Sequence, residues 1–106
     1  MLAQRGRFSE PTLLVLVSLL GGPKHGYAIG EDIAVVAGRR LGPGTLYGAI
    51  GRLEESGLVM ALDGDGRRRP YALTDAGWSI AEQEARRLAG LGRVAALRLR
   101  AERSTA

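Results

Sequence analysis

The stretch Leu41–Val59, LGPGTLYGAIGRLEESGLV, decides the fold of this chain. Pro43 suits the first turn of a helix, where its missing N–H is not needed, and Gly44 or Thr45 can serve as the N-cap. Gly57 is typical of the left-handed position that ends a helix. Between these ends, four apolar residues recur at helical spacing, which predicts a face turned towards a core. They are Leu46, Ala49, Ile50 and Leu53.

The opposite face of this helix is small, polar and basic, with acid only at its C-terminal end. Its residues are Thr45, Tyr47, Gly48, Gly51 and Arg52, followed by Glu54 and Glu55. Such a face suits the major groove of DNA, and an ordinary amphipathic surface helix is the alternative. Each interior glycine costs about 1 kcal/mol relative to alanine, so we expect the backbone to lie close either to DNA or to another helix.

Length and composition predict one domain that gains from dimerisation. The chain has 106 residues, a net charge of +4 and no cysteine. The absence of cysteine excludes a disulfide framework and a thiolate nucleophile, and Lys24 is the only basic residue besides His25 that is not arginine. Arginine suits phosphate and guanine contacts, so nucleic acid is the first partner to consider. No signal peptide or membrane-spanning run is present, which makes a soluble cytoplasmic protein the expectation.

The segments before this helix predict a helix-turn-helix arrangement. Residues 1–7 form a basic arm, and Ser9 is an N-cap candidate for a helix over residues 12–20. That helix is apolar nearly all round, which predicts that a partner subunit covers part of it. A second helix is expected from residue 24 to about 36, and a short turn then leads into the helix of Leu41–Val59. Its inner stripe should be Ile29, Ile33 and Val36.

A β-hairpin is expected after the helix of Leu41–Val59. Residues 58–62 form one strand, residues 63–66 a turn, and residues 67–74 the return strand. The arginines Arg67, Arg68 and Arg69 lie just past the tip of the hairpin. A solvated charged surface is the ordinary explanation of such a run. Directly after a candidate DNA-reading helix, it favours a wing that lies along the phosphate backbone or enters the minor groove.

A long final helix is expected from about residue 76 to 100, and Gly90 and Gly92 can bend or shorten it. At 1.5 Å per residue it is about 37 Å long, more than one small domain can cover. Its apolar stripe therefore predicts a homodimer, with packing inside one subunit as the alternative. The expected dimer contacts come from the first and last helices. They are Leu13, Leu16, Leu88, Leu91, Ala95 and Leu99.

Four motifs together resemble the PadR family of bacterial transcription regulators over residues 8 to about 78. They are HGY at residues 25–27, LGPGTLYGAI at 41–50, RLEESGLV at 52–59, and GRRRPYALTDAG at 66–77. The resemblance implies a winged helix-turn-helix dimer that binds an operator and represses transcription. It implies dimerisation through the C-terminal helix and, in some members, release from DNA by a small aromatic or hydrophobic effector.

The resemblance implies DNA contact by Thr45, Leu46 and Tyr47, at the start of the recognition helix, and by the wing arginines Arg67, Arg68 and Arg69. Residues 67–71 match the family's wing and its return strand. Arg52 is expected either to pair with a guanine edge or to clamp a phosphate, and a salt bridge with Glu55 is its alternative. Two departures matter. Gly51 stands where many relatives have a basic residue, and the chain lacks the large C-terminal domain of longer members.

The remaining chemistry-bearing side chains predict no enzyme, no metal and no cofactor. His25 is the only histidine, and no Ser/His/Asp set or phosphate-binding glycine loop is present. Tyr27 and Trp78 are candidates for an effector pocket, although ordinary packing is the commoner role of such residues. Two other functions stay open: a winged helix used for protein–protein contact, and a constitutive DNA-binder without an effector.

The predicted architecture is mainly α with a small β-hairpin (α+β). A winged helix-turn-helix DNA-binding domain covers residues 8–75, and a long C-terminal dimerisation helix covers residues 76–103.

Overall fold

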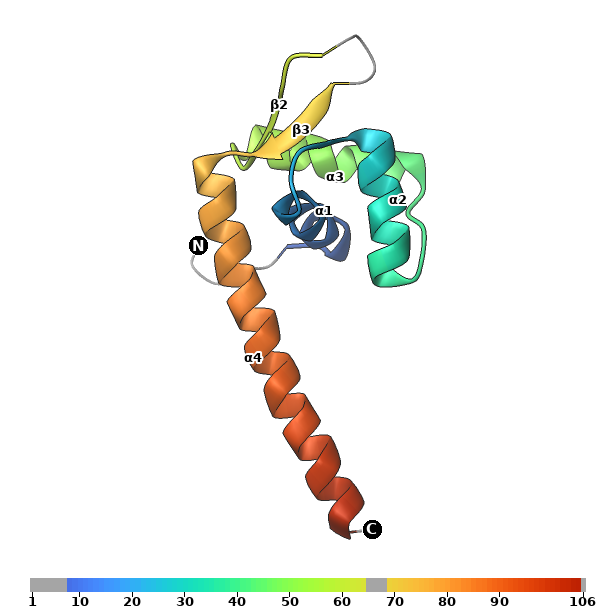
Figure 1. Cartoon of the computed structure of the whole chain (residues 1–106), viewed down its shortest axis with the longest axis vertical. Helices are drawn as coiled ribbons and strands as arrows, with labels where there is room; N and C mark the ends of the chain where they lie inside the picture. Colours follow the sequence, from blue (N-terminus) through green and yellow to red (C-terminus); the bar gives the residue numbers. More distant parts are fainter. Residues whose placement is uncertain (1–7, 65–68, 106) are drawn as a thin grey trace.

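The computed structural model describes residues 8–64 and 69–105. The order of elements is helix, strand, two helices, two strands and a long last helix (Figure 1). They are α1 (Glu10–Leu20), β1 (Lys24–His25), α2 (Gly26–Ala37), α3 (Pro43–Glu55), β2 (Val59–Ala61), β3 (Pro70–Leu73) and α4 (Asp75–Thr105). The expected basic arm at residues 1–7 lies outside the described residues. No helix within the described ranges is long and apolar enough to cross a membrane.

Helix α1 is the centre of the structure, since α2, α3, α4 and β3 all pack against it. Ser9 caps its start, as predicted: the Ser9 Oγ accepts the Thr12 N–H at 3.4 Å, and the Thr12 hydroxyl donates to the Ser9 carbonyl at 2.8 Å. At the other end, the Lys24 Nζ donates to the carbonyl of Ser18 at 2.5 Å. A cation at this position satisfies a free carbonyl and opposes the negative end of the helix dipole.

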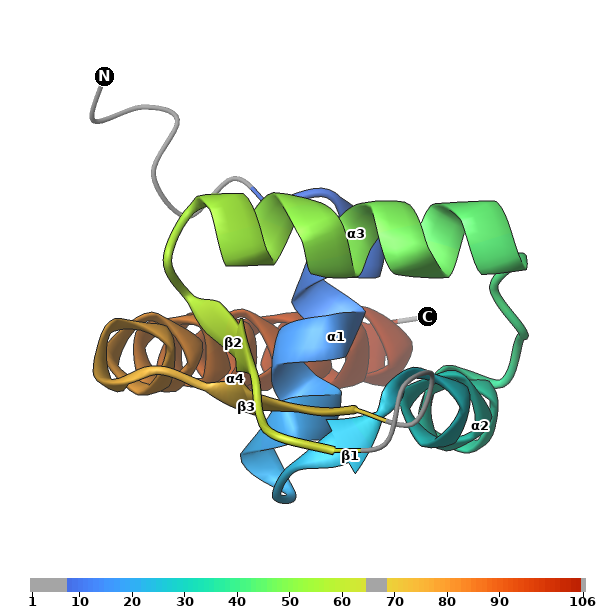
Figure 2. The same ribbon diagram turned by 90° about the horizontal axis from the view of Figure 1, so that it is seen from above.

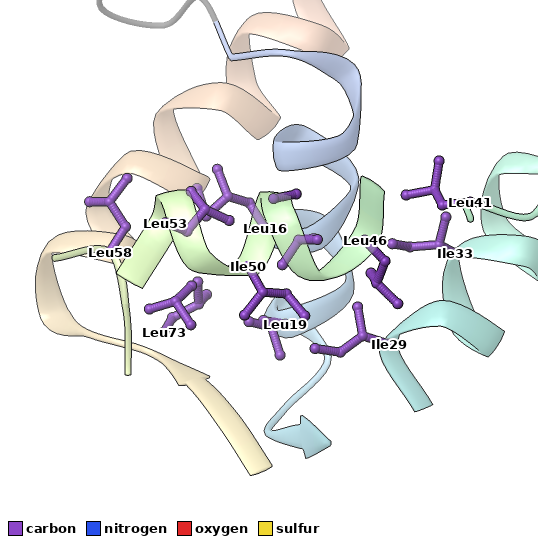
Figure 3. Packing of buried hydrophobic residues seen from close by; sticks show 14 residues of the cluster. Leu16, Leu19, Ile29, Ile33, Leu41, Leu46, Ile50, Leu53, Leu58 and Leu73 are labelled. Atoms are coloured by element: carbon purple, nitrogen blue, oxygen red, sulfur yellow. The ribbon is translucent and has the colours of Figure 1, made fainter. Parts of the chain in front are cut away.

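The core fills the space between α1, α2 and α3 and reaches the sheet (Figure 3). Figure 2 shows α3 lying across α1 at one edge of the molecule, with the other described elements on one side of it. The four apolar residues predicted to form the inner face of α3 are all buried. They meet Leu16 and Leu19 of α1, which are both almost completely buried.

The caps of α3 differ from the prediction at one end only. Gly42, in extended conformation, is the N-cap, and Pro43 is the first helical residue. The N-cap therefore stands two residues before Gly44 and three before Thr45, the two caps we expected, because proline at the first helical position leaves the cap to the residue before it. The other end is confirmed, since Gly57 has a φ of 77° just after the helix.

Helix α2 differs from the prediction at its start and in the exposure of Val36, whereas its end agrees with the prediction. It begins at Gly26, because Lys24 and His25 form a short strand, and Val36 is exposed where an inner position was expected. Ile29 and Ile33 are buried as predicted, but the last turn of α2 extends past the elements that cover the helix. A periodic apolar pattern in the sequence does not reveal where the neighbouring elements stop covering the helix.

The sheet has three antiparallel strands in the order β1–β3–β2. The predicted hairpin is confirmed by pairs such as Val59 with Leu73 and Met60 with Ala72. The third strand, β1, was not predicted. It pairs with the return strand β3, where Lys24 lies opposite Tyr71. A strand of two residues is too short to show an alternating pattern in the sequence.

Helix α4 is longer than expected, with 31 residues, and it runs uninterrupted through Gly90 and Gly92. Thr74 caps its start, because the Thr74 Oγ1 accepts the Gly77 N–H at 3.0 Å and donates to the Gly57 carbonyl at 2.7 Å. On its inner side Gly77, Ala81 and Glu84 are buried. From residue 85 onwards no described side chain of α4 is buried, and the helix leaves the body of the molecule (Figure 1).

Candidate nucleic-acid interface

The outer side of α3 is formed largely by bare backbone. A Cβ placed on Gly44 or Gly51 would meet nothing within 4 Å, and one on Gly48 would meet only the Arg52 guanidinium at 3.6 Å. The two interior glycines therefore do not serve to pack α3 against another described helix. Of the two explanations for their presence, close approach of an external partner is the one that remains within this chain.

Four predicted DNA-contact residues of α3 fall into two groups. Thr45, Tyr47 and Arg52 are exposed beside the outer side of the helix. Leu46 is 5% exposed and belongs to the core, so its side chain is unavailable to a partner and only its backbone lies near the helix N-terminus. Within the family motif, Leu46 therefore has a structural role, whereas its neighbours Thr45 and Tyr47 are exposed to a partner.

Arg52 is not engaged in a salt bridge with any described residue, so the predicted alternative pairing with Glu55 is absent there. It borders a surface hollow of about 230 Å³ at the start of α1, together with Ser9 and Thr12. Its guanidinium folds back towards Gly48. An unpaired guanidinium beside an open helix face can bind a phosphate or a base edge without first breaking an ion pair.

The wing is described only in part, since Arg67 and Arg68 lie outside the described residues. Arg69 is exposed immediately before β3. Tyr71 follows on the same strand, where burial raises the pKa of its hydroxyl above the ordinary value and the nearby Glu54 carboxylate and Tyr47 raise it further. Tyr71 therefore lies near enough to Glu54 and Tyr47 of α3 to be affected by their charges.

Two arginines of the α2–α3 turn form ion pairs that the sequence did not reveal. Arg39 donates to Glu10 at 2.9 Å, and Arg40 is paired with Glu31. The hydrogen bond from Arg40 lowers the pKa of the Glu31 carboxyl below its ordinary value. Because these pairs are exposed, they contribute little to stability, but they tie the turn to α1 and α2 just before α3.

The two residues predicted to share an effector pocket are not brought together. Tyr27 borders a hollow of about 190 Å³ between α2 and the start of α3, beside Gly30, Leu41 and Tyr47. Trp78 borders a different and larger hollow of about 530 Å³, between the end of α1 and α4. Its other lining residues are Leu20, Ser79, Glu82 and Ala85. The two aromatic residues therefore border separate hollows.

The predicted dimer residues also divide. Leu16 is 0% exposed and belongs to the core of its own subunit, while Leu13 is half-buried. On α4, Leu88 is 38% and Leu99 67% exposed, and Leu91 and Ala95 are exposed between them. These four residues continue the line of Gly77, Ala81 and Glu84 along the helix, so the side of α4 that is buried in the body continues beyond it.

Glu84 is a buried acid that the sequence pattern did not single out. Its side chain is 7% exposed and accepts three hydrogen bonds from Arg87, the shortest at 2.7 Å. Arg87, three residues on, has its pKa raised by this bond. The pair ends the packed part of α4.

His25 caps α2 without a side-chain hydrogen bond, and the described residues contain no cluster of three or more metal-ligating side chains.

Comparison with known proteins places this arrangement in a family. The Transcriptional regulator PadR-like family matches residues 13–83. A 37.1 kDa protein in a transposon of Streptomyces fradiae is 52% identical over 89 residues, which are 83% of this chain and 26% of that protein. The chain thus spans about a quarter of the length of this relative.

Two solved structures extend the similarity to three dimensions. A PadR family transcription regulator from Clostridium difficile has 25% identity and a TM-score of 0.72, over 86% of this chain and 99% of that one. The PcaV transcriptional regulator from Streptomyces coelicolor, in complex with its natural ligand, has 27% identity and a TM-score of 0.70, over 82% of this chain and 60% of that one. The winged helix with a long C-terminal helix is thus shared with known regulators, and the chain belongs to the PadR-like family of transcriptional regulators.

Proposed function

We propose that this chain is a sequence-specific DNA-binding repressor of the PadR type that acts as a homodimer. The observation that carries the proposal is the outer side of α3, where a strip of glycine backbone is flanked by exposed Thr45, Tyr47 and unpaired Arg52. The core holds the opposite side of α3 rigidly. A rigid helix with a low outer side and polar flanks can enter the major groove deeply.

Each side chain has a stated role in this proposal. Thr45 and Tyr47, in the first half of α3, bond phosphates near the positive end of the helix dipole. Arg52 pairs with a guanine edge or clamps a phosphate. The wing, with Arg69 at its return strand, adds contacts to the backbone or the minor groove.

The dimer forms through the inner stripe of α4 beyond the body, which we define as Leu88, Leu91, Ala95 and Leu99. These residues leave apolar surface exposed on a helix that no described element of the same subunit covers. In a symmetric dimer two copies of α3 read a pseudo-palindromic site whose half-sites lie about one helical turn of DNA apart.

The proposal includes a small hydrophobic effector. The hollow beside Trp78 is lined by Leu20 and Ala85 and has room for a small hydrophobic compound. It lies between α1 and the first turns of α4, so a ligand there would alter the angle at which α4 leaves the body. The structure of PcaV with its natural ligand supports the general idea of a ligand-responsive regulator.

The test of the proposed function is binding of the purified protein to duplex DNA as a function of salt. We expect selection from random 30-bp duplexes to enrich one pseudo-palindromic sequence. Replacing Arg67, Arg68 and Arg69 with Ala should weaken binding to all duplexes alike. It should also reduce the slope of log affinity against log salt by up to about 0.9 for each phosphate that the variant no longer neutralises.

A matched control removes the same charge elsewhere. Arg86, Arg93 and Arg100 are exposed and lie seven residues apart, along one line of α4. Their replacement with Ala should leave the salt slope nearly unchanged. Absence of salt-dependent binding by the wild type would reject the DNA-binding function and favour a winged helix used for protein–protein contact.

A second prediction separates stability from binding. Replacing Gly48 and Gly51 with Ala should stabilise the fold by up to about 2 kcal/mol, because each new methyl group has open space and alanine is the better helix former. The same variant should bind its selected duplex at least tenfold more weakly, because two methyl groups keep the backbone of α3 away from the groove floor. Thermal unfolding and fluorescence anisotropy measure the two effects independently.

An increase in both stability and affinity would show that the glycines do not face DNA. Gly90→Ala serves as the control, since it removes a helix glycine in α4 and should not change affinity through the groove.

A further inference from the structure

The first residue of α2 leaves a gap that a ring from α3 fills. A Cβ on Gly26 would lie 2.3 Å from the Tyr47 hydroxyl oxygen, 2.5 Å from its Cε1 and 2.6 Å from its Cζ. These distances are far below van der Waals contact, so no residue other than glycine leaves the outer end of the Tyr47 ring where it is. Gly26 does not have a positive φ, which means that space and not backbone conformation demands the glycine here.

The contact is made by the outer end of the ring. Tyr47 is 49% exposed, so one side of the ring lies on Gly26 while the other side is open to solvent. Gly26 itself is buried beneath it. The Tyr47 hydroxyl therefore lies at the start of α2, although the Tyr47 backbone belongs to α3.

A second glycine makes the same approach possible one turn later. A Cβ on Gly30 would lie 3.1 Å from the Cδ2 of Leu46, a tight contact that requires the leucine side chain to shift slightly. Gly26 and Gly30 are four residues apart and so lie on one side of α2. That side allows the start of α3 to come close, with Leu46 turned into the core and Tyr47 turned along the surface.

Tyr71 lies on the strand beside the start of α2. Its register on β3 places it opposite Lys24 of β1, the residue that precedes His25 and Gly26. Burial raises the pKa of the Tyr71 hydroxyl, and the nearby Glu54 and Tyr47 raise it further. The start of α2, which leaves room for the Tyr47 ring, is thus fixed to the sheet by the pairing of β1 with β3.

We propose that Gly26 is a positioning residue of the DNA interface: by leaving room for the Tyr47 ring, it sets where the Tyr47 hydroxyl meets the sugar–phosphate backbone. This inference rests on the proposed function. It adds to that function a residue that itself needs no contact with DNA. With a side chain at position 26, the ring swings outward and the hydroxyl loses its place while α3 keeps its own.

The test is a double-mutant cycle with a fluorescein-labelled 30-bp duplex of mixed sequence, at one fixed salt concentration and well below the unfolding temperature. Gly26→Ala should weaken binding about tenfold, the loss of roughly one strong hydrogen bond. Tyr47→Phe, which keeps the ring and removes only the hydroxyl, should weaken it by a similar factor. In the Tyr47→Ala background, Gly26→Ala should change affinity by less than about twofold, because the side chain with which the new methyl collides is gone.

Gly30→Ala is the matched control, because it adds the same methyl group to the same side of α2 but beside Leu46. Whatever it costs should be the same with Tyr47 or with Ala at position 47. Thermal unfolding of each variant shows that the proteins compared are folded at the temperature of the assay.

The outcomes distinguish this inference from the function on which it rests. Wild-type protein that binds no duplex would overturn both. Wild-type protein that binds, together with a Gly26→Ala variant of unchanged affinity, would overturn only the inference. So would a Gly26→Ala loss of equal size in the Tyr47→Ala background, since Gly26 would then act through general stability and not through Tyr47.

Discussion

Gly77→Ala should destabilise the protein by about 3 kcal/mol or more, although the substitution exchanges the second-worst helix former for the best. Gly77 lies in the first turn of α4, where a Cβ would stand 1.9 Å from the Leu58 carbonyl oxygen and 2.9 Å from its carbon. Both atoms are backbone, and the same carbonyl accepts the Thr74 N–H at 3.0 Å. The methyl group cannot enter unless α4 moves away from the segment between α3 and β2.

The measurement is thermal unfolding followed by circular dichroism. For a domain of this size 1 kcal/mol corresponds to about 4–8 °C, so the midpoint should fall by roughly 12 °C or more. Gly51→Ala makes the same chemical change inside a helix but in open space, and its midpoint should rise. A Gly77→Ala protein as stable as the wild type would mean that α4 does not lie against the Leu58 carbonyl in solution.

Leu88→Glu combined with Leu99→Glu should convert the dimer to a monomer and reduce affinity for the selected duplex at least a hundredfold. Both leucines are exposed in the single subunit, at 38% and 67%, so the fold itself should survive. A charge in an apolar subunit contact is costly because it loses its water without gaining a partner. Separate subunits also lose the effective concentration with which the second half-site is bound, which is worth about 10²–10⁴ in affinity.

Light scattering at micromolar concentration measures the mass, and anisotropy measures the binding. The matched control is Leu97→Glu with Ala101→Glu. Leu97 lies two residues from both Ala95 and Leu99, and therefore on the opposite side of α4. That variant should remain a dimer. A monomeric wild type would reject the dimer, and dissociation of both variants would show that the contact is not confined to the inner stripe.

Much of the helix-turn-helix part was predictable from local signals. Pro43 and Gly57 mark the two ends of α3 because their preferences do not depend on distant residues. The spacing of Leu46 and Ile50 predicts the inner face because burial follows helical period. The β2–β3 hairpin was predicted for a similar reason, since the sequence between its strands contains Gly64 and Gly66, which are typical of a turn.

The features that the sequence concealed depend on contacts between distant segments. A glycine that makes room for a ring, as at Gly26, has the same letter as one in open space, as at Gly51, and only the neighbouring element distinguishes them. Leu16 and Leu88 are both leucines on apolar helix faces, yet one is core and the other is exposed. The end of the covered region of α4, marked by the buried Glu84, depends on where α1 stops.

The hydroxyl of Thr74 joins the Gly57 carbonyl, just after α3, to the first turn of α4. This junction helps to fix the angle between α4 and the body of the molecule. In the proposed dimer, the distance between the two DNA-reading helices is set by the angle at which each α4 leaves its body. A helix of 31 residues is about 46 Å long, so a tilt of about 5° at its base displaces its far end by roughly 4 Å. That displacement is about the rise of one base pair along a DNA strand. A small change of angle at the Thr74 junction would therefore alter the distance between the two α3 helices of the proposed dimer. The preferred spacing of the half-sites would then change by about one base pair.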